Sequence, residues 1–327
     1  MLVLTQSDVE AVLTMEEAIA AVEDGFRQLA LGNVEMPQRA ATEIAQRNGL
    51  HLSMPAYVGG DVDSLAIKVV TVYGDNPANF GLPMIQGVVL LHDARTGTLL
   101  AMMDAEHLTA MRTGAVSGVA TRALAREDAS IATIFGAGAQ AFAQVEAVCA
   151  VRPIEQVFVV TRTGQKDLNF GLRLERRLGV RARSSRDPRT AVESADIICT
   201  ATNATEPLFN ATWVQEGAHI NAVGAYSRSM RELDGRLLQN ARVYVDHHVA
   251  AQAEAGDIMI AVDQGALSYD QVLGDLGALL TGAANGRRHA GDVTIFKSVG
   301  LAMQDAVTAS RVYANALAAG VGRQITL

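Results

Sequence analysis

The chain has 327 residues, of which 49% are hydrophobic and 19% are charged, and its formal net charge at pH 7 is -8. This length allows about two domains with substantial cores. The composition excludes a disordered chain, and the negative charge argues against a nucleic-acid binder. The most apolar region, residues 84–103, is interrupted by His92, Asp93 and Arg95, so we expect no membrane span.

The cysteines and the first residues of the chain indicate the cellular compartment. Cys149 and Cys199 both lie in apolar runs, which is typical of core thiols in a reducing compartment. Residues 1–12 contain acids and lack the basic flank of a signal peptide. We therefore expect a cytoplasmic protein.

The first third of the chain combines helices with short strands. Thr14 and Glu17 form a capping box, and apolar positions at helical spacing follow it as far as Leu31. Four alternating or β-branched runs, separated by turn residues, predict a small antiparallel sheet. The runs are residues 50–54, 66–72, 87–92 and 98–103, and a helical pattern follows over residues 105–125.

The rest of the chain is organised around a glycine turn between a strand and a helix. Residues 131–135 predict a buried strand, and residues 141–151 are rich in helix formers. Between them lies a G-x-G-x-x-A turn. Its first glycine allows a tight turn, its second lets the backbone approach the phosphates of a dinucleotide, and its final alanine lets the helix pack on the strand. The alternative is an ordinary turn between a strand and a helix.

Strands and helices alternate after this turn. The expected strands are residues 157–161, 197–201, 219–223 and 243–246, and the expected helices are residues 168–178, 189–194, 271–280 and 302–319. This alternation predicts an α/β fold, with a Rossmann-type doubly wound parallel sheet domain beside a smaller α+β domain. We expect residues 113–302 to form the dinucleotide-binding domain and residues 1–112 with 303–327 to form the smaller one.

The end of the second strand of a dinucleotide fold meets the adenosine ribose. An acid there favours NAD, whereas a cation favours the 2′-phosphate of NADP. In this chain the strand ends in Thr161, Arg162 and Thr163, without an acid, and a guanidinium suits a phosphate. The sequence therefore favours NADP (NADPH), with NAD as the alternative if Arg162 is only a surface arginine.

Seven stretches resemble the ornithine cyclodeaminase/mu-crystallin family, in the same order and over nearly the whole chain. They are MPQRA (36–40), LAIKVVTVY (65–73), GLPMIQGVVLLHDARTG (81–97), LTAMRTGAVSGVATR (108–122), FGAGAQ (135–140), GAHINAVGA (217–225) and FKSVG (296–300). The resemblance implies a homodimer of two-domain subunits. One domain carries the glycine turn, and the other binds the substrate and makes the dimer contact.

The resemblance also implies a substrate site. Arg39 and Arg112 match arginines that hold the substrate carboxylate, and Lys68 matches a lysine of the same site. Met54 belongs to an apolar segment shared with the mu-crystallin-like and imine-reductase members and is assigned to this site too. The residues themselves agree, because Lys68 lies inside an apolar strand, where an unpaired ammonium is costly. The alternatives are a snorkelling lysine and structural ion pairs.

The cofactor is expected at the glycine turn and at the ends of later strands. The assigned residues are Arg112, Gly136, Ala137, Gly138, Ala139, Gln140, Thr161, Arg162, Thr163, Thr200, Ala201, Val223, Gly224, Ser298, Val299 and Gly300. We expect no metal, because the adjacent His247 and His248 point opposite ways in an extended segment and lack a third ligand. Asp246 and Asp257 are interpreted as helix caps.

Two positions depart from the pattern of the cyclodeaminase branch. Tyr226 stands where that branch has an aspartate, and Leu52 stands where it has a glutamate. A tyrosine, whose reference pKa is about 10, is a poor base near neutral pH. The departures make cyclodeamination of ornithine a less suitable assignment.

The sequence thus predicts an NAD(P)H-dependent oxidoreductase that reduces a cyclic ketimine, pyrroline-2-carboxylate or piperideine-2-carboxylate, to the L-amino acid. Arg39 and Arg112 would clamp the carboxylate, and Lys68 would polarise the site or give a proton to the imine nitrogen. The alternatives are an ornithine cyclodeaminase, an alanine dehydrogenase-like amino-acid enzyme, or an NADPH-dependent small-ligand binding protein like mu-crystallin. The expected partners are a small imino or amino acid and a second copy of the chain, without nucleic acid or membrane.

Overall fold

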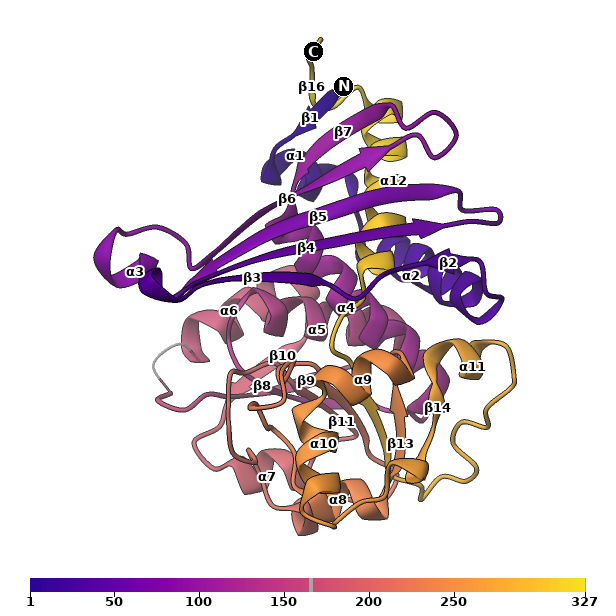
Figure 1. Cartoon of the computed structure of the whole chain (residues 1–327). Coiled ribbons are helices and arrows are strands. Elements are labelled where there is room, and N and C mark those ends of the chain that lie inside the picture. Colours follow the sequence, from indigo (N-terminus) through magenta and orange to yellow (C-terminus); the bar gives the residue numbers. More distant parts are fainter. Residues whose placement is uncertain (165–166, 327) are drawn as a thin grey trace. The chain divides into compact units, whose positions relative to one another are not determined.

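The computed structural model describes residues 1–164 and 167–326 (Figure 1). Residues 165 and 166, inside the expected dinucleotide-binding domain, and residue 327, at the end of the other, lie outside the described residues. The chain divides into two compact units, Met1–Arg112 with Leu301–Leu327 and Thr113–Gly300. Within the described ranges, no helix has the length and apolar character needed to cross a bilayer.

The first unit is built on an eight-stranded sheet in the order β16-β1-β7-β6-β5-β4-β2, with β3 also paired to β4. Its strands are β1 (Leu2–Leu4), β2 (Val34–Glu35), β3 (Ala40–Ile44), β4 (Gly49–Val58), β5 (Ser64–Tyr73), β6 (Ile85–His92), β7 (Leu99–Asp104) and β16 (Arg323–Gln324). The four expected strands form its centre and are antiparallel. The sheet is larger than predicted and is mixed, because β1 runs parallel to β7.

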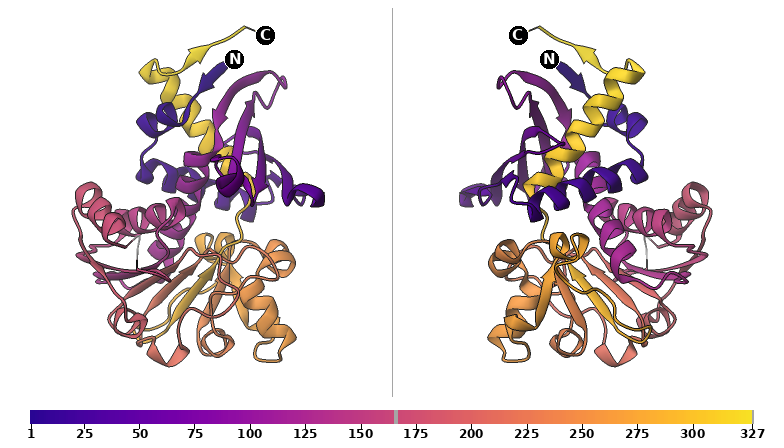
Figure 2. Two further views of the ribbon diagram at one scale, coloured as in Figure 1. Left: turned by 90° about the vertical axis from the view of Figure 1, so that its left-hand side faces the viewer. Right: turned by 90° about the vertical axis from the view of Figure 1, so that its right-hand side faces the viewer.

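Helices cover one face of this sheet. They are α1 (Gln6–Val12), α2 (Met15–Ala30) and α12 (Ala302–Ala319), while α3 (Asn76–Asn79) and the short η1 (Ala45–Arg47) lie in its turns. The capping box of Thr14 and Glu17 starts α2 as predicted. The helix α12 packs across β4, β5 and β6 and against α2 (Figure 2). A Cβ at Gly25 of α2 would lie 2.9 Å from Met303 Sδ of α12, so a glycine there allows the two helices to approach closely.

The second unit contains the predicted doubly wound parallel sheet, in the order β10-β9-β8-β11-β12-β15-β13-β14. Its strands are β8 (Ile131–Phe135), β9 (Gln156–Val160), β10 (Arg181–Ser184), β11 (Ile197–Thr200), β12 (His219–Ala222), β13 (Arg242–Val245), β14 (Val272–Asp275) and β15 (Thr294–Lys297). Its helices are α5 (Ala139–Val151), α6 (Asp167–Leu178), α7 (Pro188–Glu193), α8 (Gly235–Asn240), α9 (His248–Glu254), α10 (Gly256–Asp263) and α11 (Leu276–Leu280), with the short turns η2 (Ala211–Trp213) and η3 (Tyr269–Gln271). The long helix α4 (Ala105–Leu124) contains the boundary between the units.

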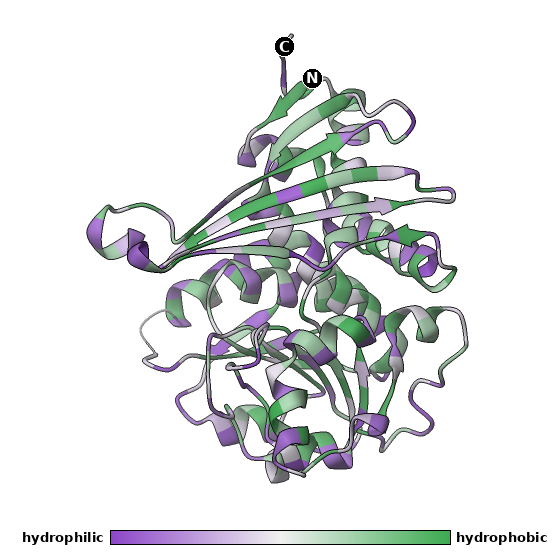
Figure 3. Ribbon diagram, viewed as in Figure 1, coloured by the Kyte–Doolittle hydropathy of each residue, from purple (hydrophilic) through white to green (hydrophobic). Residues whose placement is uncertain are grey.

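Both faces of the parallel sheet are buried. Ile134 and Ile197 belong to one hydrophobic cluster, whereas their neighbours Phe135 and Ile198 belong to another, because successive strand residues point to opposite faces. Figure 3 shows hydrophobic residues along the strands and hydrophilic residues mainly on the outer turns and helices.

Part of the secondary structure differs from the prediction. The expected helix over residues 271–280 is wrong in its first half, since η3 leads into the strand β14 and only Leu276–Leu280 is helical. The strands β1, β2, β3, β10, β14, β15 and β16 were not predicted either. They have only two to five residues, and β3 and β10 are largely exposed, so they show no apolar periodicity that separates them from other short segments.

Candidate active site and cofactor site

The first sheet aligns three of the predicted substrate residues. Met54 in β4 pairs directly with Lys68 in β5, so the two side chains share one face. Arg39 lies one residue before Ala40 of β3, and Ala40 pairs with Ser53, the neighbour of Met54. Met54 and Lys68 are buried, and Arg39 is half-buried.

A buried carboxylate of α12 joins Lys68 to Arg112. Lys68 Nζ lies 3.0 Å from Asp305 Oδ1 and 2.9 Å from Asp305 Oδ2. Arg112 Nε donates a hydrogen bond to Asp305 Oδ1 at 3.0 Å, and its Nη1 donates to Gln304 Oε1 at 2.7 Å. Lys68, Arg112 and Asp305 are 3%, 6% and 1% exposed, so the ion pairs are shielded from solvent.

The cluster holds more positive than negative charge. Lys68 and Arg112 share the single carboxylate of Asp305, and Arg39 lies close enough to lower the pKa of Lys68. A buried excess of positive charge is unfavourable unless an anion compensates it. The arrangement therefore suits the carboxylate of a small ligand.

Burial lowers the pKa of Lys68 toward neutral pH, where a general acid is effective. Loss of hydration is the main cause that lowers the pKa of Lys68 to about 8, and the positive charge of Arg112 adds to it. The negative charge of Asp305 opposes the shift. A general acid works best when its pKa lies near the operating pH, so Lys68 can release a proton far more easily than an ordinary lysine.

In the second unit, the glycine turn after β8 has the shape that a dinucleotide needs. Gly136 has φ of 115°, and a Cβ there would lie 2.6 Å from the carbonyl oxygen of Ala201. Gly138 caps the start of α5 without a side-chain hydrogen bond, and a Cβ there would meet no atom within 4 Å. The backbone is thus open beside the amino end of a helix, which fits a pyrophosphate.

The remaining predicted cofactor residues of this unit lie at the same edge of the sheet, because β8, β9, β11, β12 and β15 are all parallel. Residues 161–163 follow β9, Thr200 ends β11 and Ala201 follows it, residues 223–224 follow β12, and residues 298–300 follow β15. Arg112, which was assigned to both sites, belongs to the first unit.

A sequence profile of the ornithine cyclodeaminase/mu-crystallin family matches residues 1–320. The chain belongs to this family. The Delta(1)-pyrroline-2-carboxylate reductase of Bacillus cereus is 37% identical over 326 residues, which cover 99% of each chain. The structure of the Thermococcus litoralis Delta(1)-pyrroline-2-carboxylate reductase in complex with NADH and L-proline is 40% identical, with a TM-score of 0.95 over 99% of this chain and 100% of that one. An archaeal alanine dehydrogenase dimer with bound NAD is 36% identical, with a TM-score of 0.93 over 100% of this chain and 99% of that one.

The two departures from the cyclodeaminase branch of the family lie in different units. Leu52 is two residues before Met54 on the same face of β4 and pairs with Val70, so the surface next to Lys68 is apolar on this side. Tyr226 is 52% exposed in the loop after β12. An apolar surface offers no partner for a second amino group of a substrate.

Asp305 and Gln304 were not predicted from the sequence, and two other acids differ from the prediction. Asp246 is not a helix cap, because its Oδ2 accepts hydrogen bonds from Ser298 Oγ and from the backbone N–H groups of Val299 and Gly300, at 2.8 to 2.9 Å. Asp257 also caps no helix through its side chain. Asp305 lies among mainly small, apolar residues at the start of α12. An acid in such a segment is a signal that could have indicated a functional residue.

Of the two threonines predicted to bind the phosphate, Thr161 is bonded within the protein and Thr163 is exposed. The hydroxyl of Thr161 donates to the buried Asp167, which also accepts from Ser184 Oγ at 3.0 Å, and the N–H of Gly164 donates to Thr161 at 3.1 Å. Thr161 therefore holds the turn after β9. Arg162 and Thr163 are exposed.

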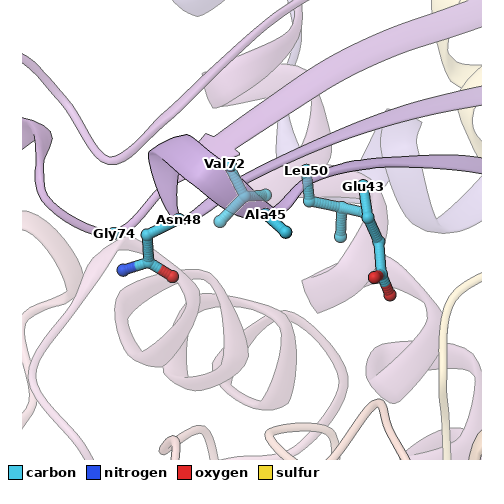
Figure 4. A pocket seen from close by; sticks show the side chains of 7 residues that line it. Glu43, Ala45, Asn48, Leu50, Val72 and Gly74 are labelled. Carbon is cyan, nitrogen blue, oxygen red and sulfur yellow. The ribbon is translucent and has the colours of Figure 1, made fainter.

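A separate pocket of about 360 Å³ lies in the first sheet, where β3 and β5 end and β4 begins (Figure 4). Leu50 and Val72, which pair across β4 and β5, form part of its wall together with Glu43 and Asn48. Its lining contains no cation and none of the predicted site residues, so it does not offer the chemistry of the Lys68 cluster.

Proposed function

We propose that this protein uses a reduced nicotinamide cofactor to reduce a small cyclic ketimine that carries a carboxylate, such as pyrroline-2-carboxylate or piperideine-2-carboxylate, to the L-amino acid. The observation that carries the proposal is the buried cluster in which Lys68 and Arg112 share Asp305. Its excess positive charge suits a carboxylate, and Lys68 suits the donation of a proton. The pyrroline-2-carboxylate reductases among its relatives support this substrate class.

The chain's own residues bind the substrate and move one proton. Arg39 and Arg112 hold the substrate carboxylate, and Lys68 Nζ donates a proton to the imine nitrogen. When bound, the reduced nicotinamide supplies the hydride for the imine carbon. The π bond of C=N breaks as a C–H and an N–H bond form, and Lys68 regains its proton from solvent. Asp305 holds Lys68 and Arg112 in place throughout.

For the cofactor, the proposal includes a preference for NADP over NAD. Arg162 follows β9 and Arg186 follows the neighbouring β10, and both are exposed. The nearest acid in sequence, Asp167, is 1% exposed and occupied by Thr161 and Ser184, so it is not available to a ribose hydroxyl. Two arginines beside the expected ribose position support binding of a 2′-phosphate.

We also propose that the first unit mediates a homodimer, in a cytoplasmic setting. Phe80, Leu82, Met84 and Ile85 follow one another closely and are 45% to 71% exposed, which is typical of an interaction surface. The archaeal alanine dehydrogenase relative is a dimer. Both cysteines are free thiols, in keeping with a reducing compartment. Light scattering coupled to gel filtration should give twice the chain mass, and a monomer at all concentrations would contradict the dimer.

A substrate panel tests the proposed reaction. Pyrroline-2-carboxylate, piperideine-2-carboxylate, pyruvate with ammonium, and L-ornithine would each be offered with both cofactors, in the appropriate redox form. We expect the cyclic ketimines to be consumed fastest. Faster amination of pyruvate would favour an alanine dehydrogenase-like enzyme instead. Tight binding of NADPH without turnover of any substrate would favour a binding protein.

A further inference from the structure

A buried charge network, consisting of Glu232, Asp257 and Lys297, lies in the second unit. All three residues are 0% exposed. Asp257 Oδ2 lies 2.9 Å from Lys297 Nζ. Asp257 Oδ1 accepts hydrogen bonds from the backbone N–H groups of Glu232 at 2.6 Å and Leu233 at 2.9 Å. The network thus runs from Glu232 through Asp257 to Lys297.

The carboxylate of Glu232 joins the loops that follow β11 and β12. Its Oε2 accepts from Thr200 Oγ1 at 2.7 Å and from the N–H of Gly224 at 2.8 Å. Its Oε1 accepts from both the N–H and the hydroxyl of Thr202, each at 2.7 Å. A Cβ at Gly224 would lie 2.3 Å from Glu232 Oε1, so a glycine is required for this approach. Burial raises the pKa of Glu232, and these hydrogen bonds oppose that shift because four donors on two oxygens favour the ionised carboxylate.

The other end of the network reaches a third loop. Lys297 is the last residue of β15 and pairs with Ala222 at the end of β12. It directly precedes Ser298, Val299 and Gly300, which Asp246 holds separately. The network therefore connects the carboxyl ends of three neighbouring strands, β11, β12 and β15. These ends carry Thr200, Ala201, Val223, Gly224, Ser298, Val299 and Gly300, the predicted cofactor residues of this part of the sheet.

Stability alone does not explain such a network. Two carboxylates and a lysine without solvent are often no more stabilising than apolar side chains of the same volume, and Leu233 beside Glu232 already belongs to a hydrophobic cluster. A site that must bind a ligand in one orientation gains from loops held rigidly by buried hydrogen bonds. The network provides such hydrogen bonds at the three strand ends.

We propose that Glu232 is a positioning residue for the nicotinamide cofactor, and that its network holds the ends of β11, β12 and β15 as a preformed binding surface. The inference rests on the proposed cofactor site at this edge of the sheet. It does not involve Lys68 or the substrate carboxylate, so it concerns the affinity for the cofactor and not the protonation of the imine.

The variant E232Q tests this proposal, with D196N as a matched control. Glutamine keeps the volume of Glu232 but places an NH₂ group against hydrogen-bond donors. Asp196 is another largely buried carboxylate of the same unit and directly precedes β11. It accepts from Arg126 and from the backbone N–H groups of Ser130 and Ile131 at the start of β8, at the opposite edge of the sheet. We expect E232Q to raise the Kd of NADH and of NADPH by about tenfold or more, and D196N to change neither Kd, even where both variants lower the melting temperature.

A second pair of variants keeps the test decisive if E232Q does not fold. T202V removes one hydroxyl donor to Glu232 and the acceptor of the Ala204 N–H group, whereas T202S keeps both contacts. We expect T202V to raise the Kd of both cofactors by about threefold to tenfold, T202S to bind them as the wild type does, and T202V to add little when combined with E232Q.

Wild-type Kd values in folded E232Q, or in T202V, would overturn the proposal, as would independent, additive effects of the two substitutions. Failure of the wild-type protein to bind either cofactor would contradict the proposed function as well. Binding by the wild type together with unaffected binding by E232Q would contradict the positioning role alone.

Discussion

Lys68 and Asp305 form a buried ion pair between β5 and α12, although they lie 237 positions apart in the sequence. Lys68 Nζ is within 3.0 Å of both carboxylate oxygens, and Arg112 binds the same carboxylate. One acid thereby fixes the positions of two cations from two other elements of the first unit. In the proposed function, the substrate site depends on this carboxylate for its geometry, and on the remaining positive charge for its affinity toward an anion.

The pH dependence of the reaction should report the titration of Lys68. Its pKa is lowered to about 8, mainly by burial, and its protonated form is the proposed proton donor. The kcat/KM for ketimine reduction should therefore be highest below about pH 8 and fall as the pH rises through this value. Initial rates at saturating cofactor from pH 6 to 10 would measure it. A profile that stays level to pH 10 would contradict the role of Lys68 as the acid.

Removal of the Asp305 charge should shift the pH profile of kcat/KM to lower pH. Asp305 raises the pKa of Lys68 by its charge and by a hydrogen bond, so D305N should lower that pKa and shift the alkaline fall of kcat/KM to lower pH. The KM for the ketimine should also change, because Arg112 loses its partner. The substrate's own titration is the same for both enzymes and cancels in the comparison. An unchanged pH profile in a folded D305N enzyme would show that Asp305 does not act on Lys68.

The cofactor preference should depend on Arg162. Loss of a hydrogen bond to a charged group costs about 1.5–3 kcal/mol, which corresponds to roughly tenfold to a hundredfold in affinity. R162A should weaken NADPH binding by this amount and leave NADH binding nearly unchanged. The matched control is R176A, which removes an exposed arginine of α6. Tighter binding of NADH than of NADPH by the wild-type protein would contradict the assignment.

L-Ornithine should be a poor substrate. Leu52 and Val70 make the surface beside Lys68 apolar, and Tyr226 stands in place of the acid of the cyclodeaminase branch. We expect little ammonia from L-ornithine with NAD, compared with the rate of ketimine reduction. Ammonia release at a comparable rate would show that these two positions do not exclude the diamino acid.

Local patterns in the sequence predicted the elements whose signals are local. The capping box at Thr14, the glycine turn at residues 136–141 and the full extent of α12 are confirmed, because caps, turns and helical periodicity involve neighbouring residues. The strand β15 was missed, since it has only four residues and ends in Lys297, whose charge hides its burial. A single charge in a short apolar run does not tell a strand from a loop.

The site was predicted less completely than the fold. Lys68 could be found because a lysine inside an apolar strand is unusual, whereas its partner Asp305 comes from the far end of the chain. Asp257 was misread as a cap because only the tertiary structure brings Lys297 and the backbone of Glu232 to it. Pairs of this kind form only in the tertiary structure and give no signal in the local spacing of residues.

The most direct test of the proposed reaction is the rate of ketimine reduction by K68M at saturating cofactor. Methionine has a similar length and lacks the ammonium, and Asp305 keeps Arg112 as its partner, so the variant should fold. Its glycine turn belongs to the second unit, so it should bind NADPH with nearly the wild-type Kd; melting curves and cofactor titrations would verify both points. We predict that its rate is lower by about two orders of magnitude or more. A wild-type rate in folded, cofactor-binding K68M would contradict the account.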